Sequence, residues 1–131
     1  MKKTLLIFIS FILLMHCKPQ QVLITNIEWK LTKLEGRDVS SLNPPVTLLL
    51  DESQKKVSGY AGCNRFFGSY QSENTGITFS GMGSTKMFCQ ETMPIEDAYF
   101  KALGNVQAFK TTDNQLHLMA GNKVVLEFSR P

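Results

Sequence analysis

The sequence has few of the residues from which metal centres and thiol-based active sites are built. Its 131 residues include three cysteines and two histidines, and no Cys-x-x-Cys motif occurs. A catalytic cysteine needs a neighbouring group that stabilises its thiolate, and a protein-bound zinc ion needs about four ligands. The composition therefore supports neither a thiol-based enzyme nor a zinc protein, and no metal or other cofactor is predicted.

Clustered positive charge is also missing. The chain has 14 lysines and arginines against 11 acidic residues, a net charge of +3, and the two signs are mixed along its length. Two of the lysines, Lys2 and Lys3, belong to an N-terminal export segment described below, and without them the net charge is +1 (+3 − 2). Because nucleic-acid binding requires clustered lysine and arginine, no nucleic-acid partner is predicted.

No apolar run is long enough to cross a membrane. The longest covers residues 5–15 and is interrupted only by Ser10, whereas a membrane-spanning helix needs about 20 apolar residues. A basic start and a short apolar region before a polar segment are typical of a secretory signal peptide. We therefore expect residues 1–16 to be a signal peptide.

Cys17 follows this segment, and its position resembles that of the cysteine in a bacterial lipobox, with Leu14 at the usual place three residues earlier. Such a cysteine becomes the lipidated N-terminus of the mature protein, which gives stable anchoring when it carries more than one acyl chain. His16 stands where a small residue is usual, so cleavage elsewhere without a lipid and an uncleaved anchor remain alternatives. The pattern predicts a membrane anchor at Cys17, a tether over residues 17–25, and a location in the cell envelope, at the outer membrane facing the periplasm.

Lipidation of Cys17 leaves Cys63 and Cys89 as the remaining cysteines. An exported protein meets an oxidising compartment, where an isolated cysteine pair forms a disulfide more often than it stays reduced. We predict a structural disulfide between them. Free buried thiols and a redox or nucleophilic role remain alternatives.

Residues 26–131 have the length of one domain, and their apolar pattern predicts short strands. Strands are expected at 27–34, 46–51, 55–61, 77–79, 106–111, 115–120 and 123–129, with a bulge or bend near Gly68. One helix is expected to begin near Pro94 and to end at Gly104. The predicted fold class is mainly β (α+β), a curled antiparallel sheet or small barrel of about seven to eight strands with the helix plugging an open side.

Several motifs occur in an order that resembles a known family. They are Trp29-x-Leu31, Gly59-x-x-Gly62-Cys63-Asn64, Gly68-x-Tyr70, Ser84-Thr85-x-Met87-x-Cys89, a helix with Glu96 and Phe100, Leu116-x-Leu118 and Leu126-x-Phe128. In this order they resemble the META domain, the HslJ-like family, over residues 25–129. The resemblance implies a small barrel-like domain, export in many members, and pairing of the two motif cysteines. It implies no established enzymatic activity, and it links the chain loosely to stress response, drug tolerance, motility or virulence.

A catalytic site has weaker support. His117 lies between Leu116 and Leu118 in a predicted strand, so it is expected to point outward, and nothing in the spacing places it beside Cys63 or Ser84. The loop over 81–85 lacks the Gly-Lys-Ser/Thr ending of a phosphate-binding loop. Three carboxylates near the helix start are interpreted as charges in solvent rather than as an acid–base pair; they are Glu91, Glu96 and Asp97.

Aromatic residues near the cysteines are expected to lie mostly in the core, and they are also the candidate ligand or partner surface; they are Phe66, Phe67, Tyr70 and Phe88. Phe66 and Phe67 cannot share one strand face, so one of them is expected to be exposed or to line a cleft. Asn64 is expected to satisfy local backbone groups in its turn.

The sequence predicts a non-enzymatic exported lipoprotein domain with an envelope-stress or envelope-maintenance role. The alternative is a binding or assembly module for an apolar ligand or for a segment of an envelope protein partner.

Overall fold

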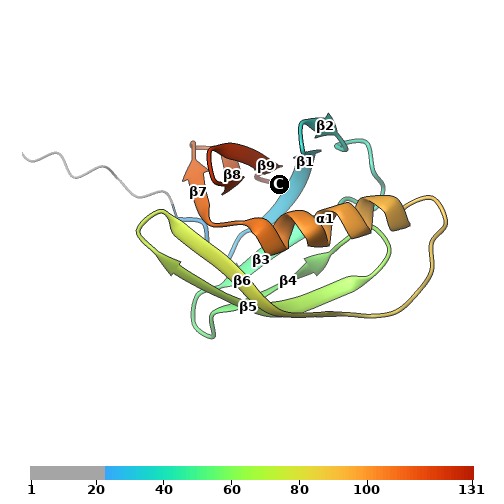
Figure 1. Cartoon of the computed structure of the whole chain (residues 1–131), viewed down its shortest axis with the longest axis horizontal. Helices are drawn as coiled ribbons and strands as arrows, with labels where there is room; N and C mark the ends of the chain where they lie inside the picture. The colour runs from blue at the N-terminus through green and yellow to red at the C-terminus, as the bar shows by residue number, and fades with distance from the viewer. Residues whose placement is uncertain (1–22) are drawn as a thin grey trace, which may run out of the picture.

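The computed structural model describes residues 23–131, so the predicted signal peptide, Cys17 and most of the tether lie outside the described residues. This part of the chain forms nine strands and one helix (Figure 1). They are β1 (Glu28–Leu34), β2 (Arg37–Asp38), β3 (Thr47–Asp51), β4 (Lys56–Tyr60), β5 (Arg65–Glu73), β6 (Gly76–Ser84), α1 (Met93–Asn105), β7 (Ala108–Thr111), β8 (Gln115–Ala120) and β9 (Lys123–Ser129). Within residues 23–131, no helix is both long and apolar enough to span a bilayer.

Eight of the strands form an antiparallel ring in the order β1-β3-β4-β5-β6-β7-β8-β9, which pairing between β1 and β9 closes. The short strand β2 pairs with the end of β1. The ring is weakest between β6 and β7, which share the single residue pair Gly76 and Ala108. Helix α1 packs against β6, β8 and β9 and lies across this opening (Figure 1). The predicted mainly β fold with a helix on its open side is confirmed.

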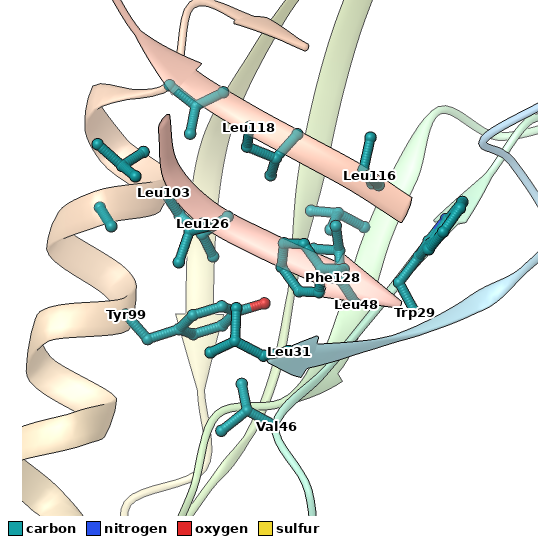
Figure 2. Packing of buried hydrophobic residues seen from close by; sticks show 14 of the residues in the cluster. Trp29, Leu31, Val46, Leu48, Tyr99, Leu103, Leu116, Leu118, Leu126 and Phe128 are labelled. Carbon is teal, nitrogen blue, oxygen red and sulfur yellow. The ribbon is translucent and has the colours of Figure 1, made fainter. Parts of the chain in front are cut away.

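Strand alternation supplies the core of the barrel. In β1, Trp29 and Leu31 are buried while Glu28 and Lys30 are exposed, because successive side chains on a strand point to opposite faces. Figure 2 shows buried side chains of several strands and of α1 pointing toward one another. Among those it labels are Leu48 of β3, Tyr99 and Leu103 of α1, Leu116 and Leu118 of β8, and Leu126 and Phe128 of β9.

Two strands differ from the predictions. The sequence predicts a strand only over residues 77–79, but β6 runs from Gly76 to Ser84. Gly81, at a φ of +61°, bends this strand without ending it. The sequence predicts no strand directly after residue 34, but Arg37 and Asp38 pair with β1 as β2. The expected irregularity near Gly68 is confirmed, since the register of β5 against β6 shifts between Phe67 and Ser69.

Candidate functional site

Two glycines, one at the end of β4 and one in the turn between β4 and β5, allow the backbone conformation of this region. Gly62 has a φ of +117°, a backbone conformation that residues with a Cβ atom rarely adopt. Gly59 lies so close to the backbone of Thr47 on the neighbouring strand that a Cβ atom would collide with the Thr47 carbonyl oxygen. These glycines allow the chain to reverse tightly and to present Cys63 and Asn64 toward the start of α1.

Cys63 forms a disulfide with Cys89, and their Cα atoms are 5.7 Å apart. Cys63 is 1% exposed at its turn, whereas Cys89 belongs to the extended segment over residues 85–92 that connects β6 to α1. The predicted disulfide is confirmed. It fixes the connecting segment to the β4–β5 turn.

Glu96 of α1 lies beside this disulfide and is 3% exposed, so the prediction that it is a solvent-exposed charge is wrong. Its Oε2 atom accepts hydrogen bonds from the backbone N–H groups of Cys63 (3.0 Å) and Asn64 (2.7 Å). Its Oε1 atom accepts a third from Nδ2 of Asn64 (2.7 Å). These donors offset the cost of burying a carboxylate.

The Asn64 side chain uses its full hydrogen-bonding capacity. Its Oδ1 atom accepts from the Met87 backbone N–H (2.7 Å) and from Oγ1 of Thr85 (2.9 Å). Its Nδ2 atom donates to the Met87 carbonyl oxygen (3.0 Å) as well as to Glu96. Asn64 was expected to form hydrogen bonds only within its own turn. Its side chain instead forms hydrogen bonds with the backbone of a segment more than 20 residues away.

We call this set of residues the clasp; it consists of Cys63, Asn64, Thr85, Met87, Cys89 and Glu96. The clasp holds three parts of the chain together, namely the β4–β5 turn, the segment over residues 85–92, and the first turn of α1. The polar and cysteine side chains of the two central motifs are thus bonded to one another and to Glu96.

A groove of about 580 Å³ lies beside the clasp, on the outer face of the sheet. We call it the clasp groove; it is lined by Glu28, Pro44, Pro45, Thr47, Tyr60, Cys63, Arg65, Thr85 and Met87. Thr47, Tyr60 and Arg65 lie side by side on β3, β4 and β5, and alternate with neighbours that point into the core. The volume is within the range of about 300–1,000 Å³ that ligand pockets have.

Hydrogen bonds fix the floor of the clasp groove. The Tyr60 hydroxyl donates to the Gly62 carbonyl oxygen (2.9 Å), and the Tyr60 backbone N–H donates to Oγ1 of Thr47 (3.1 Å). Beneath the sheet, the Tyr99 hydroxyl donates to the Thr47 carbonyl oxygen (3.3 Å). Burial raises the pKa of Tyr99 well above its usual range.

The four predicted surface aromatics separate into two pairs. Phe66 and Tyr70 are 2% and 1% exposed, so the prediction that they contribute to a surface is wrong. Phe66 packs edge-on against Tyr99, with ring centroids 5.6 Å apart, because it points inward from β5. Phe67 and Phe88 are 60% and 80% exposed, and neither lines the clasp groove. A partner-binding role for these two stays a prediction.

His117 lies on β8, opposite Lys110 of β7 and Glu127 of β9. It is partly exposed, and its Nε2 atom lies 3.1 Å from Oε1 of Gln115. Its neighbours across the sheet are therefore neither the clasp nor Ser84 of β6. Within residues 23–131, the structure brings no three histidine, cysteine or acidic side chains together in an arrangement that would hold a metal ion.

Sequence reasoning missed Glu96, although a signal was present. Glu96 precedes Tyr99 by three residues and Leu103 by seven, which places it on the buried face of α1. The sequence contains no comparable signal for the clasp groove. Its walls come from segments that only the strand register brings together.

Comparison with known proteins identifies a family and two experimental structures that are at least 25% identical to this chain in sequence. The META domain profile matches residues 22–131. A protein from Burkholderia xenovorans solved by NMR is 31% identical, with a TM-score of 0.67 over 82% of this chain and 83% of the other. A second NMR structure is 25% identical, with a TM-score of 0.63 over 79% and 88%.

A third structure shows only that the fold recurs. It is the crystal structure of a DUF4847 family protein from Bacteroides vulgatus, 16% identical, with a TM-score of 0.54 over 66% of this chain and 59% of the other. No curated protein matches the chain.

Proposed function

Because the chain belongs to the META domain family, we propose that it is an HslJ-like lipoprotein of the cell envelope whose barrel is a non-enzymatic binding module. The barrel binds a partner in the clasp groove and contributes in this way to envelope maintenance or to the envelope-stress response. The clasp groove is the observation that carries this proposal.

The state of the clasp residues supports a structural task for them. Cys63 and Cys89 are bonded to each other, and the Asn64 side chain has no hydrogen-bonding position left for a substrate. The oxygens of Glu96 accept from three donors. Groups that are satisfied by one another rigidify their surroundings. The clasp therefore acts as a support that fixes Thr85 and Met87 as one wall of the groove.

The surface of the clasp groove supports binding. Pro44, Pro45 and Met87 give it apolar walls, and Tyr60 is held in place by its bond to Gly62. A methionine side chain is flexible and adapts to the partner it contacts. Met87 is 61% exposed, so its side chain has room to change conformation when a partner binds. A preorganised floor beside an adaptable wall lowers the entropic cost of binding.

Export and anchoring rest on the N-terminal sequence, in which the basic start, the apolar run and Cys17 follow in order. We propose that Cys17 carries the lipid and holds the barrel at the outer membrane, on the periplasmic side. Mass spectrometry of the protein purified from membranes is expected to show an acylated Cys17 as the first residue. A mature protein with an unmodified Cys17 contradicts the anchor.

Photo-crosslinking in intact cells tests the binding function. A photoreactive phenylalanine analogue at Met87 is expected to give a discrete adduct, which co-expression of the unchanged protein in excess outcompetes. The same analogue at the exposed Lys110 on β7, outside the groove, is the matched control and is expected to give none. Equal labelling from both positions, or no competition, contradicts a binding function of the groove.

A further inference from the structure

The clasp groove carries one positive and one negative charge, one on each of its outermost strands. Arg65 on β5 and Glu28 on β1 both line it and are both exposed. Among residues 23–131 the ion pair found is that between Lys33 and Glu127, so neither groove charge is neutralised by a contact within this part of the chain. Their charges remain available to a ligand.

The sheet order sets the distance between the two charges. Strands β3 and β4 lie between β1 and β5. Neighbouring strands are about 4.8 Å apart, so the three steps from β1 to β5 span roughly 14 Å across the sheet. The register places Glu28 level with Phe67, two residues or roughly 7 Å along β5 from Arg65, so the Cα atoms of Glu28 and Arg65 are roughly 16 Å apart. An extended peptide advances about 3.4 Å per residue, so about four to five residue steps cover this distance. The apolar walls formed by Pro44, Pro45 and Met87 line the path between the two charges.

The two charges distinguish a peptide from a membrane lipid as the occupant. An acyl chain has no charged groups along its length, whereas an extended peptide can carry one acidic and one basic side chain at the separation that Arg65 and Glu28 require.

We propose that the clasp groove binds an extended peptide segment of a partner protein, with an acidic side chain against Arg65 and a basic one against Glu28. Three apolar residues between these two charges contact Tyr60, the prolines and Met87. The proposal rests on the binding function given above and specifies the chemistry of its ligand. The complementary charges fix the position of the segment across the strands.

A charge-swap titration tests this ligand. The probe is a labelled peptide with glutamate, leucine, proline, leucine and lysine in that order, and a second peptide carries glutamine at both charged positions. The full chain, purified with its anchor in lipid nanodiscs, is expected to bind the charged peptide at least tenfold more tightly than the neutral one. Arg65→Glu and Glu28→Lys are each expected to remove this preference.

The double variant Arg65→Glu/Glu28→Lys is expected to restore the preference, because the peptide then binds in the reverse direction. Restored binding also shows that the variants fold. Lys123→Glu and Glu73→Lys are matched controls with the same charge changes at exposed strand positions outside the groove, and are expected to bind as the unchanged protein does.

Five outcomes overturn the proposal. Four come from the titration: equal affinity for both peptides, no saturable binding of either, no restoration in the double variant, and displacement of the peptide by laurate at submicellar concentration. The fifth is self-association through the groove, detected by sedimentation of the unliganded protein. If the Met87 adduct in cells persists while the titration fails, the ligand chemistry is wrong and the binding function stands; if both fail, neither stands.

Discussion

The two sides of the barrel are held together by different interactions. Between β8, β9 and β1 the backbone ladders are long, and the side chains beneath them are fully buried and apolar. At the start of α1, beyond the Ser84 end of β6, the connection is made instead by the side chains of the clasp. The ladder between β6 and β7 consists of one residue pair, at Gly76 on the other end of β6. Polar side chains and a disulfide thus hold α1 and the segment before it to the β4–β5 turn.

This difference separates stability from the candidate function. The ladder side determines whether the barrel folds, since it contains Trp29, Leu118 and Phe128 at 0% exposure. The clasp side determines where Thr85 and Met87 lie, and these residues form a wall of the clasp groove. Changes on the two sides are therefore expected to have different consequences.

The largest loss of stability is expected from Phe128→Ala on the ladder side. Phe128 is fully buried and packs against Tyr99, with ring centroids 6.5 Å apart. Removing such a ring costs about 3–5 kcal/mol of unfolding free energy, because a cavity remains. Urea unfolding measures this change. Phe88→Ala, at an 80% exposed position, is the control and is expected to stay within about 0.5 kcal/mol; equal losses would contradict the assignment of the core.

The next largest effect is expected from removing the disulfide with Cys63→Ala and Cys89→Ala together. The cysteines are 26 residues apart, and a loop of this length corresponds to about 3.5 kcal/mol in the chain-entropy account of cross-linking. The double variant is expected to fold with a lower midpoint in urea, since the hydrogen bonds of Asn64 and Glu96 remain. A midpoint equal to that of the oxidised protein would show that the disulfide does not stabilise the barrel.

A smaller loss is expected from Glu96→Gln. Both Glu96 oxygens face N–H donors, so a glutamine places its own NH₂ group against one of them. Losing a charged acceptor and leaving a buried donor unpaired costs about 2–3 kcal/mol. The control is Asp97→Asn, the exposed neighbour on the same helical turn, which is expected to change stability by less than about 0.5 kcal/mol. Equal losses of stability in the two variants would show that Glu96 behaves as a surface charge.

Sequence patterns were sufficient for features that depend on local periodicity. The alternation in β1 and β9 identified strands, Pro94 marked the start of α1, and counting cysteines identified the disulfide. The alternation also required Phe66 and Phe67 to face opposite ways, but it did not determine which one is inside. That choice follows from the register of β5 against β4 and β6, which is a non-local property.

Features that depend on the meeting of distant segments were not predictable in this way. The sequence predicts a strand that ends at Phe79, yet β6 continues to Ser84. Gly83 lies against the Phe67 ring of β5, where a Cβ atom would come within 2.7 Å. The clasp groove combines residues from β1, β3, β4, β5 and three connecting segments. Only the closed ring of strands brings these together.

The central claim is that the clasp positions one wall of the groove while the ladder side holds the barrel. Residue-resolved amide hydrogen exchange in the Glu96→Gln variant tests it most directly. The Met87 amide, which donates to Asn64, is expected to lose nearly all of its protection, whereas the amides of Leu118 and Leu126 lose only the protection that matches the global loss of stability. If Met87 and the β8–β9 amides lose protection equally, the clasp is not a separate support and the claim is wrong.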